Sequence, residues 1–284
     1  MARLEAQRVP LMVAGALVAL TIWIVLTALA EPYDWSVVGA GHDARPYWTA
    51  SSEDPYRTSR VGDHDAYLYS PAFLQLIEPL RALPWQGFFS IWTLVLLAAT
   101  LGVVGPLLLA PALLLVVPEL VGGNVSLLIA LAIVAGFRWP VTWSFVLLTK
   151  VTPGIGLLWF AVRREWRSLG LALGATAAVV AVSWLIAPGA WRDWIAVLTA
   201  NVGSPVTSGS FPIPLLARLP VAIALIAWGA RTDRRWVLPV GALLALPVLW
   251  YGSLSLLIGV VPLLRGRWAG LSAVPRVSAA PADR

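Results

Sequence analysis

Residues 107–137 read LLLAPALLLVVPELVGGNVSLLIALAIVAGF, an apolar stretch with one charge, Glu119, and a break at Gly122-Gly123-Asn124. A helix that crosses the hydrocarbon core of a bilayer needs about 20 apolar residues. We interpret this stretch as two shorter helices that meet at the glycine pair. Helices of that length cannot cross lipid alone, so we expect them to line a cavity, where broken backbone is tolerated.

The same pattern occurs twice more along the chain. Residues 139–162 break at Lys150, and residues 236–264 break at Trp250-Tyr251-Gly252. With one full span for each apolar segment, the chain would have about seven spans and Arg138 would lie outside the cell. Splitting the three segments gives about ten helices and places every arginine cluster on the cytoplasmic side, which the positive-inside rule favours.

The composition gives the same fold class. Of the 284 residues, 59% are hydrophobic and only 12% are charged, whereas a soluble domain has about 25% charged residues. We therefore predict an all-α polytopic membrane protein, with residues 1–284 as a single membrane domain. The lack of cysteine excludes thiol catalysis, disulfides and Cys-ligated zinc. The excess of arginine lies beside apolar segments, so it indicates membrane topology and no nucleic-acid partner.

The two ends of the chain carry separate predictions. Residues 11–30 are long enough for one span that follows Arg3 and Arg8, which places the N-terminus in the cytoplasm. Ala28-Leu29-Ala30 is also typical of a signal-peptide cleavage site, and that alternative stays open. Residues 269–284 are predicted to be a disordered tail.

Residues 31–87 form a polar loop that differs from the rest of the chain. They hold eight of the 14 acidic residues, both histidines and only four arginines, so we place them outside the cytoplasm, with an amphipathic segment over 71–83. A second outer loop is predicted over 188–212. The first loop could be merely a solvated acidic segment. Against this, tyrosine, tryptophan and proline are interleaved with the acids, whereas disordered acidic segments are poor in aromatics.

A carboxylate that folds down onto the membrane in this loop is partly desolvated and suited to act as a general base. Asp43 is the leading candidate. Asp63-His64-Asp65 contains an Asp-x-Asp pair, so Asp63 or Asp65 is the next candidate, with Asp34 third. The same pair could hold a divalent cation, although no cofactor is required by the chemistry proposed below.

Lys150 is the only lysine of the chain, and the residues around it are uncharged. A cation at membrane depth costs about 2.5–3.5 kcal/mol, so it is expected to face a partner or a cavity. It could snorkel or pair with Glu119, or it could await an anionic headgroup such as phosphate. The chain has no nucleotide-binding motif, so a phosphate that reaches Lys150 is expected to arrive on a lipid carrier.

The order of these elements resembles the GT-C superfamily of membrane glycosyltransferases. Within it, the chain is similar to the bacterial α-mannosyltransferases that depend on polyprenol-phosphate-mannose. Members usually carry Trp-x-His-Tyr late in the chain, whereas Trp250 is here followed by Tyr251, Gly252 and Ser253. The elements that match are Asp43 with Tyr47 and Trp48, Asp54-Pro55-Tyr56, Tyr67-x-Tyr69-x-Pro71 before Pro79-Leu80, Gly123-Asn124, and Lys150-x-x-Pro153 before Arg163-Arg164.

The resemblance implies transfer of a hexose, mannose in that family, from a polyprenyl-phosphate donor to a lipid or glycan acceptor. The transfer would take place with inversion, at the outer face of a bacterial plasma membrane. It implies that Asp43 is the base and that Lys150 meets the donor phosphate. The other residues that it assigns to substrate binding are Tyr47, Trp48, Tyr69, Asn124 and Trp250.

Two rival functions stay open at this point. A transporter or lipid flippase would use Lys150 and Glu119 as charges on its pathway, although it would predict two related halves and the chain shows none. An inactive scaffold of the same family is the other alternative.

Overall fold

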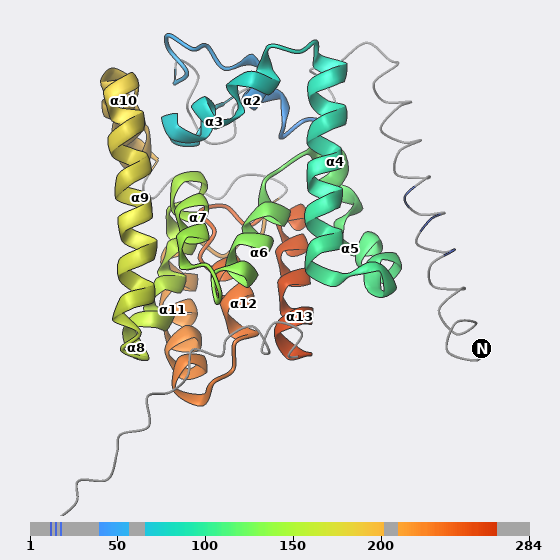
Figure 1. The fold of residues 1–284 in the computed structure, drawn as a ribbon, viewed down its shortest axis with the longest axis vertical. Coiled ribbons are helices and arrows are strands. Elements are labelled where there is room, and N and C mark those ends of the chain that lie inside the picture. The colour runs from blue at the N-terminus through green and yellow to red at the C-terminus, as the bar shows by residue number, and fades with distance from the viewer. Residues whose placement is uncertain are drawn as a thin grey trace, which may run out of the picture.

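The computed structural model describes residues 12, 15, 18, 40–56, 66–201 and 210–265. Within these residues the chain forms twelve α-helices, four 3-10 segments and no strand, which confirms the all-α prediction (Figure 1). The predicted tail at 269–284 and most of the predicted span at 11–30 lie outside the residues that the structure describes. The α-helices are α2 (Arg45–Thr49), α3 (Pro71–Arg81), α4 (Trp85–Val104), α5 (Leu109–Gly122), α6 (Ser126–Ala135), α7 (Trp143–Thr149), α8 (Leu158–Val162), α9 (Trp166–Ile186), α10 (Pro188–Ala200), α11 (Leu215–Thr232), α12 (Val237–Leu244) and α13 (Val260–Leu264); the 3-10 segments are η1 (Pro106–Leu108), η2 (Pro140–Thr142), η3 (Thr152–Leu157) and η4 (Tyr251–Gly259).

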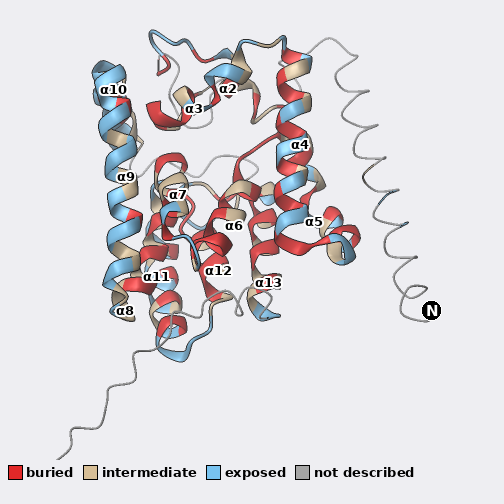
Figure 2. Ribbon diagram, in the orientation of Figure 1, coloured by how far each residue is buried: buried red, intermediate tan, exposed pale blue. Residues whose placement is uncertain are grey.

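Three of the described helices, α4, α9 and α11, are long and apolar enough to cross a membrane. In Figure 1, α4 and α9 stand on opposite sides, and α6, α7 and α12 lie between them. Most of α9 is exposed, and Figure 2 shows it mainly in pale blue and tan, whereas α6 and α12 are largely red. An apolar helix with an exposed surface is expected to face lipid, so the short helices form the protected interior.

The three predicted helix breaks are confirmed. Helix α5 ends at Gly122 and α6 begins at Ser126; α7 ends before Lys150; and α12 ends at Leu244, ahead of η4. The residues at the first break, Gly123 and Asn124, are buried, so the free backbone groups of the helix ends there must be satisfied within the protein.

The arginine-bearing turns meet at one end of the bundle. Arg235 stacks over the ring of Phe137 at 5.1 Å, next to Arg138, and Arg163 bonds Asp233 and the carbonyl of Ala230, both at 3.0 Å. The seven-span alternative placed Arg138 at the opposite end, and this geometry contradicts it. The loop over 40–56, with α2, α3 and α10, lies at the other end (Figure 1).

One outer segment differs from its prediction. Residues 188–200, expected as part of a loop, form helix α10, and the indole N–H groups of Trp191 and Trp194 bond Ser183 Oγ at 3.0 Å and the Leu68 carbonyl at 3.1 Å. Both indoles are buried. The tryptophans are three residues apart, so a helix places them on one face, and burying that face favours the helix.

The first outer loop is folded wherever it is described. Its aromatic side chains form a core: Tyr56 donates to the carbonyl of Tyr69 at 2.8 Å, and Tyr67 to that of Ser70 at 3.0 Å. Arg45 lies over the rings of Trp48 and Trp85, at 4.6 and 4.7 Å. The alternative of a merely solvated loop is therefore wrong for these residues.

Arg218 stabilises the break after α12. This buried side chain on α11 donates to the carbonyl of Ile213 at 2.9 Å and to three carbonyls at and after the end of α12, those of Leu244, Leu246 and Pro247, at 2.6, 2.9 and 3.2 Å. The carbonyls at the end of a helix have no intrahelical partner. One guanidinium thus satisfies a broken helix end inside the protein.

We expect Arg218→Met to destabilise the protein by on the order of 3 kcal/mol, because it leaves several buried carbonyls unpaired. Thermal unfolding in detergent measures the change. Arg231→Met provides the matched control, since Arg231 is exposed on the same helix. Equal unfolding temperatures for the two variants would contradict the role of Arg218.

Candidate functional site

The α5–α6 break is fixed by the loop that carries Asp43. The backbone N–H groups of Gly41 and Asp43 donate to the carbonyls of Val121 and Gly122 at 2.7 and 2.9 Å, and so cap the end of α5. Gly123 has φ +82°, and a Cβ there would stand 2.6 Å from the Cβ of Ala44. Only glycine fits this left-handed position and close approach. The loop over 40–44 and the α5–α6 break therefore hold one another in position.

Asn124 joins the loop to two helix breaks. Its Oδ1 accepts hydrogen bonds from the Val125 backbone at 2.7 Å, from Lys150 Nζ at 3.1 Å and from the hydroxyl of Tyr69 at 3.4 Å. The hydroxyl of Tyr47 donates in turn to that of Tyr69, at 2.9 Å. Four of the residues singled out in the sequence therefore belong to one hydrogen-bonded network.

Asp43 and Glu119 are the two carboxylates whose charges act on Lys150. Neither approaches Nζ within 4.0 Å, so no ion pair closes on this lysine among the residues that the structure describes. Asp43 and Lys150 are half-buried. Burial raises the pKa of Asp43, while Lys150, His42 and a hydrogen bond with Asn124 oppose the rise. A carboxylate with a raised pKa is a stronger base than an ordinary aspartate.

The third break, after α12, lies next to the cluster of Asp43, Glu119 and Lys150, because Gly252 is close to Glu119. A Cβ at Gly252 would lie 3.1 Å from Glu119 Oε2, and a Cβ at Gly122 would lie 2.9 Å from Asp43 Oδ2. The turning points of all three broken pairs are therefore close to the charged residues. The sequence singled out Glu119 as a pairing partner for Lys150 or as a second charge on a transport pathway, and its proximity to residue 252 has no signal in the sequence.

Trp48 and Trp250 lie differently from the other predicted residues. The indole N–H of Trp48 donates to the carbonyl of Leu83 at 2.9 Å, and its ring stacks with Arg45. Trp250 forms an isolated backbone bridge with Ser210, one residue before η4. Within the described chain, no hydrogen bond or ring contact joins either indole to the Asn124 network, so their roles in binding stay predictions.

The metal prediction is not tested by the described residues. Asp63, Asp65 and Asp34 lie outside them. In the described ranges, no group of three or more histidine, aspartate and glutamate side chains is placed to hold a metal ion.

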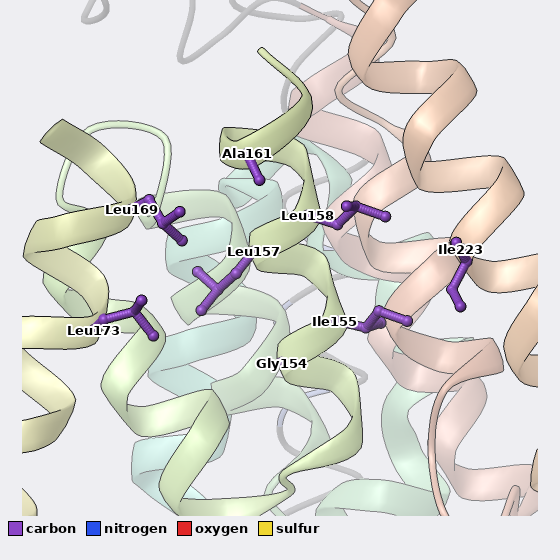
Figure 3. Close-up of a pocket in the computed structure, with 8 residues that line it drawn as sticks. All are labelled: Gly154, Ile155, Leu157, Leu158, Ala161, Leu169, Leu173 and Ile223. Carbon is purple, nitrogen blue, oxygen red and sulfur yellow. The ribbon is translucent and has the colours of Figure 1, made fainter. Parts of the chain in front are cut away.

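An apolar groove of about 490 Å³ is lined by residues that follow the Lys150 break in the chain and by two long helices (Figure 3). It begins at Gly154, four residues after Lys150, and runs between η3, α8, α9 and α11. Its lining contains only glycine, alanine, leucine and isoleucine: Gly154, Ile155, Leu157, Leu158, Ala161, Leu169, Leu173 and Ile223. Such a surface suits a hydrocarbon chain and not a sugar.

Comparison with known proteins gives one family. The family model of glycosyltransferase family 87 matches residues 67–274, well over half of the chain. The matched region contains Tyr69, Asn124 and Lys150, whereas Asp43 precedes it. No curated protein and no solved structure matches the chain.

Proposed function

We propose that this chain, which belongs to glycosyltransferase family 87, transfers a hexose from a polyprenyl-phosphate donor to a lipid or glycan acceptor. The sugar is mannose by the resemblance described above. The observation that carries the proposal is that a carboxyl group, that of Asp43, and an ammonium group, that of Lys150, both interact with Asn124, although they come from distant segments. A family that transfers sugars needs a base for the acceptor and charge stabilisation for the leaving group.

The reaction proposed is a single displacement. Asp43 removes the proton from an acceptor hydroxyl while the hydroxyl oxygen attacks the anomeric carbon, opposite the phosphate. The bond between the anomeric carbon and the phosphate oxygen breaks, and its electron pair stays on the phosphate. Lys150 stabilises the negative charge that develops there. The products are the inverted glycoside and the polyprenyl phosphate, and the proton on Asp43 passes to solvent.

The donor class is supported by Lys150 together with the apolar groove that begins after it in the chain. A lipid phosphate combines an anion with a long apolar chain, and Lys150 lies four residues before an apolar groove (Figure 3). The polyprenyl chain would lie in that groove while the phosphate meets the lysine from the site side. Tyr47, Tyr69 and Asn124 would contact the sugar.

The side of the membrane that we propose is supported by the two ends of the bundle. The arginine-bearing turns lie at one end and the Asp43 loop at the other. Because positive charge is retained in the cytoplasm, we propose that the site faces outward from a bacterial plasma membrane. The N-terminus would then be cytoplasmic.

The proposal is tested in membranes that contain the chain and labelled polyprenyl-phosphate mannose. Time-dependent formation of a labelled glycoside, together with free polyprenyl phosphate, is expected. Movement of the intact donor across the membrane without a covalent change would instead support a flippase. If neither occurs with a panel of hexose donors and membrane lipid acceptors, the chain is an inactive member of its family.

A further inference from the structure

Three exposed arginines lie at the end of the bundle where the arginine-bearing turns meet. Arg138 follows α6, Arg164 lies between α8 and α9, and Arg234 follows α11. Figure 2 shows the turn after α11 in pale blue. Within the described ranges, none of the three has an acidic side chain within 4.0 Å. We call these three residues the arginine surface.

The acidic residues at this end are bound to another arginine. Between residues 126 and 265 the sequence contains three acids, and one of them, Asp193, lies on α10 at the other end (Figure 1). The other two bind Arg163, whose Nε donates to Glu165 Oε1 at 2.7 Å and whose Nη1 lies 3.0 Å from Asp233 Oδ1. In the described part of the chain, the positive charge of the arginine surface is therefore left without a neutralising acid.

Two contacts hold the arginine surface together. The bond between Arg163 and Asp233 joins the α8–α9 turn to the α11–α12 turn. Arg235, in the second of these turns, lies over the ring of Phe137 at 5.1 Å and so contacts the segment between α6 and η2. Each member of the arginine surface is the neighbour in the chain of one of these contact residues. The three positive charges are therefore carried by segments that are fixed to one another.

Tryptophans mark the depth of the arginine surface in the membrane. Arg138 lies over the ring of Trp139 at 4.8 Å, and Arg234 over that of Trp228 at 5.5 Å. Both tryptophans are exposed, and tryptophan is enriched at the level of the lipid headgroups. A guanidinium group is attracted to the face of such a ring and lies at the same level. The surface therefore faces the phosphates of the bilayer and not its hydrocarbon core.

We propose that the arginine surface binds the headgroups of anionic phospholipids. A guanidinium group pairs with phosphate through two parallel N–H donors, and a negatively charged membrane surface attracts arginine. The acyl chains would lie against α9, an apolar helix that starts two residues after Arg164 and is mostly exposed. This binding does not depend on glycosyl transfer.

Membrane topology alone does not account for this arrangement. The positive-inside rule requires arginine on one side of the membrane, but it requires neither stacking on tryptophan nor turns joined by an ion pair. After insertion, arginines that served only topology would show no preference among lipids. A lipid preference that is lost with these three residues therefore distinguishes the two roles.

The test measures binding of a fluorescent phosphatidylglycerol to the purified full chain in uncharged detergent. Wild type is expected to bind this lipid much more tightly than phosphatidylcholine, which has no net charge, and to bind it more weakly as salt is added. Each arginine near a charged lipid surface contributes about 5-fold to affinity. We therefore expect Arg138→Gln, Arg164→Gln and Arg234→Gln each to weaken binding about 5-fold, and the triple variant about 100-fold.

Arg192→Gln is the matched control, because Arg192 is an exposed arginine on α10, at the other end of the bundle. It should bind phosphatidylglycerol as wild type does. The unfolding temperature in the same detergent shows whether each variant is folded. If the triple variant is not, the three single variants test the surface.

Four results would overturn the proposal. Three of them are equal affinity for phosphatidylcholine and phosphatidylglycerol, wild-type affinity in the folded variants of the surface, and an equal loss in Arg192→Gln. The fourth is displacement of the lipid by inorganic phosphate at the same concentration, because the surface would then bind small anions and not a lipid.

Discussion

Replacing Asp43 with asparagine is expected to lower transfer by about 10²–10⁴-fold, the contribution of a positioned general base. Asparagine has nearly the same shape, and the backbone N–H at residue 43 still caps the Gly122 carbonyl. The loop should therefore stay in place while the site loses its proton acceptor. The measurement is the initial rate of labelled glycoside formation, normalised to the amount of protein in the membrane.

Glu53→Gln is the matched control, because Glu53 is an exposed acid on the same loop. It should transfer at the wild-type rate. Full activity of Asp43→Asn would disprove the assignment and turn attention to Asp63, Asp65 or Asp34.

The pH dependence has a definite sign. A base works when it is deprotonated, so kcat/KM should fall as the pH is lowered through the pKa of Asp43. Burial raises that pKa, which places the fall at a higher pH than for an ordinary aspartate. The Asp43→Asn variant should lack this acid limb.

The helix breaks could be predicted from sequence because their causes are local. The glycine pair at 122–123 and the lone charge of Lys150 interrupt apolar stretches whose length does not suit whole spans. The common side of the arginine turns followed from the positive-inside rule. Helix α10 was missed because the charged pair Arg192-Asp193 and the Ser/Gly/Pro run that follows are typical of a loop, whereas the packing of Trp191 and Trp194 is visible only in the structure.

The candidate site was predictable in its parts but not in its assembly. Asp43 and Lys150 were singled out by residue type and Asn124 by the family resemblance, whereas their convergence depends on backbone bonds between residues 41–44 and 121–122. The sequence also gave no means of placing Gly252 beside Glu119, because the relative rotation of η4 and α5 is set by packing. A glycine in place of the expected histidine was visible as a departure. Its consequence, the close packing of Gly252 against the carboxylate of Glu119, required the structure.

Lys150→Ala is expected to raise the KM for the lipid donor about 10- to 100-fold. The ammonium is a cation that acts on both Asp43 and Glu119, and a hydrogen bond to a charged group contributes about 1.5–3 kcal/mol to binding. In its absence, the donor phosphate would approach the two carboxylates without the positive charge of Lys150 to offset theirs. The KM for the acceptor should change little, and kcat should also fall to the extent that Lys150 stabilises the leaving phosphate. Steady-state kinetics with each substrate varied in turn separates these effects.

The lysine also has a structural role that the experiment must separate from binding. Removing it leaves two buried or half-buried carboxylates without their cation, which can prevent insertion or folding. The double variant Lys150→Ala/Glu119→Gln removes one of those charges and should restore the protein level without restoring donor affinity. Arg167→Ala, an exposed arginine on the first turn of α9, is the control for loss of positive charge. If the double variant regains wild-type donor affinity, Lys150 serves only to neutralise Glu119, and the donor phosphate must be bound elsewhere.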